Sequence, residues 1–139
     1  MLIKIKEPVK IISPEVCYKL LSEILAKESQ CDRDKEHFWI IGTTTRHKVR
    51  YIDLVSLGIL NASLIHPREV FRFAVMQGVC KVLLCHNHPS EEPEPSEEDI
   101  EITNRLAEAE KISGIEVLDH IIIAENGFYS FKENGKIIF

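Results

Sequence analysis

The chain of 139 residues has 17 lysines and arginines against 22 aspartates and glutamates, a formal net charge of −5, and 45% hydrophobic residues. This length predicts a single domain over residues 1–139 with an ordinary buried core. The acidic balance disfavours a nonspecific nucleic-acid binder, which would carry a basic patch. Because no apolar run reaches membrane-spanning length and no signal peptide is recognisable, we expect a cytoplasmic protein.

The first half of the chain predicts one helix and a strand hairpin. Ser13 and Pro14 suit the N-cap and first position of a helix, and apolar residues at helical spacing extend it to about Glu28. Two buried strands are expected next, joined by a turn. The predicted segments are a polar linker over 29–35, strands over 37–42 and 49–55 with a turn at 46–48, and a loop over 58–63.

The second half alternates helices and strands. The most apolar strand, over 79–85, is expected at the centre of the sheet, and a loop with two prolines over 90–95 follows it. The other predicted elements are helices over 67–77 and 96–113, strands over 115–124 and 128–131, and a last hairpin strand over 136–139. This order predicts a mixed α/β fold in which helices flank a sheet.

Two histidines at the end of the central strand indicate a metal site. His86 and His88 are two residues apart, so in a strand both imidazoles leave on the same face, whereas Asn87 points to the opposite one. Asp99, at the start of the next helix, adds a carboxylate oxygen. Three protein ligands with a fourth position open to water are typical of catalytic zinc, so we predict one Zn²⁺ per chain.

The same residues resemble a known signature. His-x-His, seven residues, Ser, two residues and Asp is the motif of the JAMM metalloproteases, also called JAB or MPN-plus domains. The segments 61–72 and 117–123 resemble the RadC branch of that family, and the resemblance covers roughly residues 8–131. It implies a mostly antiparallel sheet related to the cytidine deaminases. We therefore expect a short, single-domain member of the RadC branch, without the helix-hairpin-helix region of longer RadC proteins.

The resemblance also implies catalytic roles. Glu36, just before the first core strand, corresponds to the general base that takes the proton of the attacking water, with Glu28 and Asp34 as alternatives. Ser96 corresponds to the residue that helps to hold the oxyanion. Ser96 and Asp99 also match a capping box, in which they would only begin a helix, and the two interpretations are partly compatible.

The remaining histidines and the cysteines favour structural roles. His37 is interpreted as structural and His120 as a core histidine or a partner of a metal ligand, while His66 as a further metal ligand is the less favoured alternative. The cysteines show no metal-binding spacing and are expected to be reduced and mostly buried, with one of them in the core behind the histidines; they are Cys17, Cys31, Cys80 and Cys85.

Acidic residues crowd the region around the proposed metal site. If they line its entrance, they repel phosphate and favour a substrate with neutral or positive groups, so a peptide or isopeptide is expected over a phosphodiester. They are Glu91, Glu92, Glu94, Glu97, Glu98, Asp99 and Glu101. Two alternatives are a domain without catalytic activity that serves as a scaffold, and a metal-dependent nuclease associated with DNA repair. Nucleic acid as a partner is suggested only by the family association.

Overall fold

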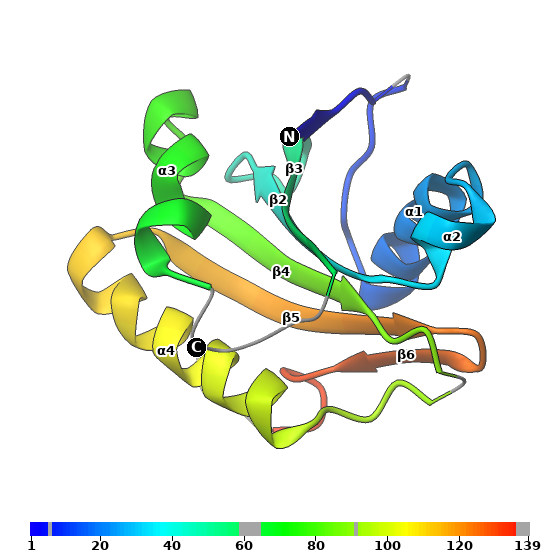
Figure 1. Ribbon diagram of the computed structural model, residues 1–139. Helices are drawn as coiled ribbons and strands as arrows, with labels where there is room; N and C mark the ends of the chain where they lie inside the picture. The colour runs from blue at the N-terminus through cyan, green and yellow to red at the C-terminus, as the bar shows by residue number, and fades with distance from the viewer. Residues whose placement is uncertain (6, 59–64, 91, 136–139) are drawn as a thin grey trace.

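The computed structural model describes residues 1–5, 7–58, 65–90 and 92–135 (Figure 1). Helices and strands alternate along most of the chain. In order they are β1 (Leu2–Ile3), α1 (Pro14–Ala26), α2 (Gln30–Arg33), β2 (Glu36–Thr43), β3 (Val49–Gly58), α3 (Pro67–Gln77), β4 (Lys81–Asn87), α4 (Glu97–Ser113), β5 (Glu116–Ala124) and β6 (Gly127–Ser130).

The strands form one six-stranded sheet in the order β1-β3-β2-β4-β5-β6. Strands β4 and β5 are parallel and every other pair is antiparallel, which confirms the predicted mixed, mostly antiparallel sheet. Strand β4 lies between β2 and β5, as expected for the most apolar strand. The antiparallel register pairs Phe38 with His86, so the start of β2 lies beside the end of β4.

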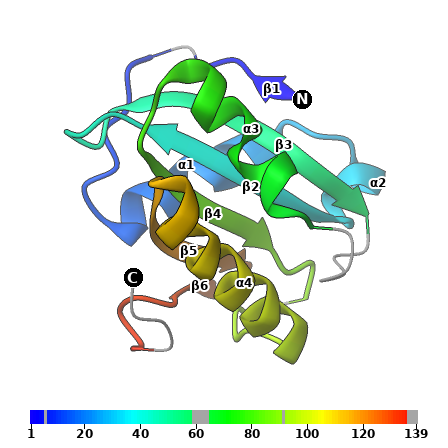
Figure 2. The ribbon, with the colours of Figure 1, turned by 90° about the vertical axis from the view of Figure 1, so that its left-hand side faces the viewer.

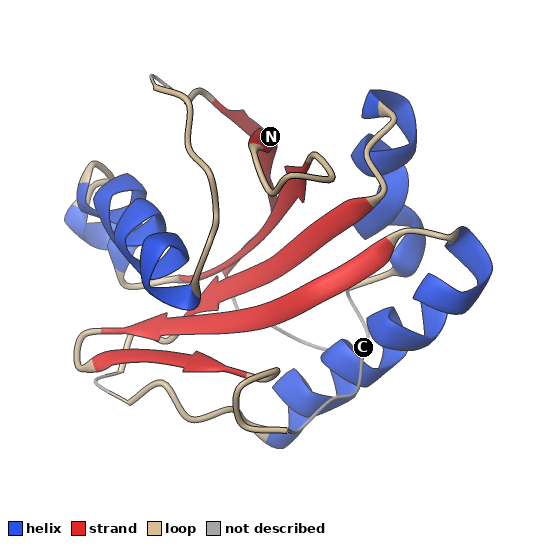
Figure 3. Ribbon diagram, turned by 180° about the vertical axis from the view of Figure 1, so that it is seen from behind, coloured by secondary structure: helices blue, strands red, loops and turns tan. Residues whose placement is uncertain are grey.

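The two faces of the sheet are covered by different helices. Alternation along β2 places Phe38 and Ile40 in a core with α3 and α4, whereas Trp39 and Ile41 pack in a second core with α1. Figure 2 shows α3 and α4 in front of the sheet and α1 behind it, and Figure 3 shows the helices and strands from the side opposite to Figure 1. Because both faces of the sheet are covered, the central strands β2 and β4 are buried at every position except the first.

Several boundaries differ from the sequence prediction. Residues 29–35 contain the short helix α2, because the Ser29 hydroxyl accepts a hydrogen bond from the Asp32 N–H at 3.2 Å and caps a single turn. The short edge strand β1 was not predicted. Strand β4 runs to Asn87, two residues further than expected, so His86 lies within the strand. The predicted strand over 136–139 and most of the predicted loop over 58–63 lie outside the described residues.

The cysteines are all free, but only two of the four are buried. Cys17 on α1 and Cys85 on β4 lie in the core with their sulfurs 3.5 Å apart, which agrees with the expected place of Cys85 behind the histidines. Cys31 and Cys80 are exposed, so the expectation that most of them are buried was wrong. Within the described part of the chain, no helix has both the length and the apolar character needed to cross a membrane.

A glycine in β2 allows an aromatic ring to lie on the backbone. A Cβ atom at Gly42 would stand 2.1 Å from Cε1 of Tyr51, its partner on β3. We therefore expect Gly42→Ala to lower the free energy of unfolding by about 1–3 kcal/mol, the usual cost of overpacking, in a denaturant titration. In a Tyr51→Ala background the same change should cost little; an equal cost in both backgrounds would contradict this contact.

Candidate metal centre

Three side chains converge at one end of β4. The Nε2 atom of His86 lies 3.1 Å from Oδ1 of Asp99, and Nε2 of His88 lies 3.0 Å from Oδ2. The two Nε2 atoms are 3.1 Å apart. His86 and Asp99 are buried, and the side chain of His88 is only 13% exposed. The three residues that the sequence predicts as ligands can therefore share one ion, and they form the only such group among the described residues.

The ends of a strand and a helix determine this geometry. The His88 N–H donates to the Ile123 carbonyl at 2.8 Å, so the backbone continues along β5 and keeps His88 on the side of His86. Asp99 is held by a capping box: its amide donates to the Ser96 hydroxyl at 3.1 Å, and its Oδ2 accepts from the Ser96 N–H at 2.9 Å. The capping interpretation and the proximity to the histidines are thus both correct.

The electrostatics of the group are those of a buried acid between two bases. Burial acts to raise the pKa of Asp99, but hydrogen bonds with His86 and His88 outweigh it, and its pKa lies well below the usual range. Burial likewise acts to lower the pKa of His88, yet the Asp99 carboxylate and the Glu92 carbonyl raise it overall. Asp99 is therefore buried and is not part of the exposed acidic surface formed by the neighbouring glutamates, contrary to the prediction from the sequence.

The hydrogen bond made by His88 Nδ1 determines which ring nitrogen can bind a cation. Nδ1 faces away from His86 and Asp99, whereas Nε2 faces them. His88 Nδ1 lies 3.1 Å from the carbonyl oxygen of Glu92, which can only accept, so Nδ1 carries a hydrogen. In the neutral ring the Nε2 lone pair then faces His86 and Asp99. Without an ion, an Nε2 proton hydrogen-bonds the Asp99 carboxylate; a divalent cation would replace that proton, and two imidazoles with one carboxylate suit a transition metal.

Glu36, the predicted base, lies at the start of β2. It precedes Phe38 by two residues and so emerges on the same face as Phe38 and His86, which stack with ring centroids 6.3 Å apart. Its negative charge contributes to the raised pKa of His88. Of the alternatives, Glu28 instead contacts His37 Nε2 at 2.5 Å, and Asp34 lines a cavity on the other face of the sheet.

Asn87 and His37 tie β2 to β4 on the opposite face. The Asn87 Oδ1 accepts from the His37 N–H at 2.6 Å, and its Nδ2 donates to the Lys35 carbonyl at 3.1 Å. These bonds bracket Glu36 and hold it opposite the end of β4. The sequence predicts the direction of Asn87 and a structural role for His37, but it does not reveal this clamp, because the two residues are 50 positions apart and no local pattern joins them.

The two other histidines of interest have different environments. His120 on β5 lies behind His86, with its Nε2 2.7 Å from His86 Nδ1, in agreement with the expected contact to a metal ligand. His66 is the N-cap residue of α3 and does not belong to the group of His86, His88 and Asp99.

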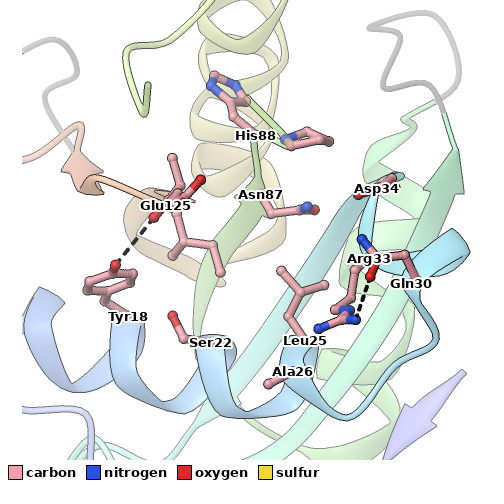
Figure 4. Close-up of a pocket in the computed structure, with 13 residues that line it drawn as sticks. Tyr18, Ser22, Leu25, Ala26, Gln30, Arg33, Asp34, Asn87, His88 and Glu125 are labelled. Atoms are coloured by element: carbon pink, nitrogen blue, oxygen red, sulfur yellow. Dashed lines mark hydrogen bonds between the residues drawn. The ribbon is translucent and has the colours of Figure 1, made fainter. Parts of the chain in front are cut away.

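A cavity of about 520 Å³ lies beside the candidate site, on the α1 face. It is bounded by α1, α2 and the ends of β4 and β5, and Figure 4 shows Asn87 and His88 on one side of it, across from Tyr18, Ser22 and Leu25 on α1. His88 borders both the cavity and the metal-binding group. Its lining includes neither His86 nor Asp99, so the cavity meets the metal-binding group only at His88.

Comparison with known proteins identifies the family. The family model described as RadC-like JAB domain matches residues 11–136, so the chain belongs to the RadC-like JAB domain family. Among curated proteins it is similar to a UPF0758 protein of Alkaliphilus metalliredigens, with 56% identity over 101 residues, which is 73% of this chain and 44% of that protein. A UPF0758 protein of Clostridium acetobutylicum is 45% identical over 129 residues, 93% of this chain and 54% of its own length. The chain thus spans about half the length of the curated relatives that it matches.

Single substitutions test the metal centre directly. The purified chain should bind about one divalent transition-metal ion, and His86→Ala or Asp99→Asn should abolish stoichiometric binding, because each removes a ligand from a three-ligand site. Elemental analysis after dialysis measures this ratio. His66→Ala is the matched control and should retain the ion; loss of the ion in this control as well would contradict the assignment.

Proposed function

We propose that the chain is a zinc-dependent hydrolase that cleaves peptide or isopeptide bonds. The observation that carries the proposal is the convergence of His86, His88 and Asp99 at a strand end, with Glu36 on the same sheet face. Two imidazoles and one carboxylate are three ligands, the number that catalytic zinc sites use, and membership of the RadC-like JAB domain family supports the same chemistry.

Each residue has a separate task in this proposal. Bound Zn²⁺ would supply positive charge that makes a water molecule more acidic near neutral pH and polarises the scissile carbonyl. Glu36 accepts a proton from the attacking water and returns it to the leaving nitrogen. The Ser96 hydroxyl accepts from the Asp99 amide and still has its own proton to donate to the developing oxyanion, a contact whose loss typically costs about 10²–10³ in rate.

The charges around the site favour a polypeptide substrate. Four exposed glutamates stand near the metal centre, before α4 and in its first turn: Glu92, Glu94, Glu97 and Glu98. Their negative charge disfavours a phosphodiester within about 8 Å, the screening distance at physiological salt. Free cysteines accord with work in the reducing cytoplasm.

Substitution of the base separates catalysis from metal binding. Glu36→Gln should keep zinc at the wild-type ratio but lower hydrolysis by about 10²–10⁴, since the amide cannot accept the proton. The assay compares the zinc-loaded chain on panels of peptide, isopeptide and DNA substrates. Asp34→Asn is the matched control and should retain full activity. Undiminished turnover in Glu36→Gln, or zinc-dependent cleavage of DNA alone, would refute the proposal.

Zinc affinity should fall as the pH falls. A protonated imidazole has no lone pair to donate, so the raised pKa of His88 means that protons compete with Zn²⁺ below that pKa. The depressed pKa of Asp99 keeps the carboxylate ionised throughout this range. We expect the Kd for zinc to rise by at least about tenfold for each pH unit below the pKa of His88, measured by chelator competition. An affinity that does not change with pH would contradict this assignment.

A further inference from the structure

A chain of buried hydrogen bonds runs behind His86 and returns to the helix that carries Asp99. His86 Nδ1 lies 2.7 Å from His120 Nε2, and His120 Nδ1 lies 2.5 Å from Oγ1 of Thr103. The Thr103 hydroxyl also lies 2.6 Å from the backbone carbonyl oxygen of Asp99, one helical turn earlier. His86, His120 and Thr103 are fully buried, so these contacts are closed to solvent.

The protons in this chain can be assigned from its two ends. A carbonyl oxygen only accepts, so Thr103 donates its single proton to the Asp99 carbonyl and must accept from His120 Nδ1–H. The neutral His120 ring then has its lone pair on Nε2, which accepts from His86 Nδ1–H. This leaves the Nε2 lone pair of His86 directed at His88 and Asp99. The opposite assignment would leave two oxygen acceptors 2.6 Å apart with no proton between them.

The surroundings of His120 favour the neutral ring in this one orientation. The ring is fully buried, and burial disfavours a charged imidazolium that has no carboxylate partner. Phe131 stacks on it with ring centroids 4.7 Å apart, and Phe38 meets it edge-on at 5.9 Å. The Asp119 carboxylate accepts its backbone N–H at 2.7 Å. The ring therefore cannot turn to exchange its two nitrogens without disturbing the core.

We propose that His120 and Thr103 are positioning residues that hold His86 in its Nδ1–H tautomer and thereby set the affinity of the metal centre. The inference rests on the proposed metal-binding role of His86. Packing alone does not require the Thr103 hydroxyl, because a valine would fill the same space. Partners of metal ligands typically contribute about 10–100-fold in metal affinity, so an effect of this size is expected here.

Two substitutions at Thr103 separate the hydroxyl from the shape. In Thr103→Val the acceptor for His120 Nδ1–H is lost, so His120 can place its proton on Nε2 and force His86 to carry its own proton on the inward nitrogen. We expect zinc to bind at least about tenfold more weakly to Thr103→Val, and Thr103→Ser to restore the wild-type Kd. Nitrogen NMR of the metal-free protein at alkaline pH should show His86 protonated at Nδ1 in the wild type and in Thr103→Ser, and a loss of that signal in Thr103→Val.

A second pair at His120 keeps the test decisive if Thr103→Val does not fold. The amide oxygen of His120→Gln can accept from His86 Nδ1–H, whereas His120→Leu cannot, so the first should retain the tautomer and the second should lose it. An unchanged zinc Kd and an unchanged His86 tautomer in Thr103→Val, or in His120→Leu, would overturn the inference. If the wild type binds no zinc, the proposed function fails, but the tautomer in the metal-free protein still decides whether this hydrogen-bond chain acts as inferred.

Discussion

The carboxylate of Asp99 is the contact on which the arrangement of this site depends. It caps the first turn of α4 through the Ser96 amide and at the same time faces the inward nitrogens of His86 and His88. A buried acid needs compensating positive charge, and here the helix N-terminus and the two imidazoles surround it. The bonds that begin α4 are therefore also the bonds that place the third candidate ligand. Helix formation and the geometry of the metal centre cannot be changed independently at this position.

Strand order determines which residues accompany this carboxylate. Because β4 is central, its end has two neighbours: antiparallel β2 contributes its first residue, Glu36, and parallel β5 contributes His120. Alternation along the strands then separates the roles of the two faces. His86 and His120 lie on the face covered by α3 and α4, whereas Asn87 and His37 form the clamp on the face covered by α1. The end of β4 thus supplies the candidate ligand His86 and, at the next residue, the Asn87 side chain that holds β2 in place.

The acidic residues around the site fall into a buried group and an exposed group. Asp99 is enclosed and partnered, whereas the glutamates before α4 and in its first turn are exposed and surround the same region. The buried carboxylate of Asp99 can attract a cation strongly at short range. The exposed glutamates attract or repel an approaching substrate only weakly, because solvent and salt screen their charges. The family domain covers residues 11–136, and this whole arrangement lies within it.

The linear sequence is enough to predict the local features: the strand that ends in His86 and His88, the cap formed by Ser96 and Asp99, the mixed α/β class and the family. These follow from alternation along one strand and from the first turn of one helix, which are short-range rules that a linear pattern carries. The neighbours of these features depend on contacts between distant segments. The alignment of Glu36 with the end of β4 and the chain from His86 to Thr103 depend on the register between segments far apart in sequence. The bonds that hold that register join buried backbone and side-chain groups, and no spacing along the chain records them.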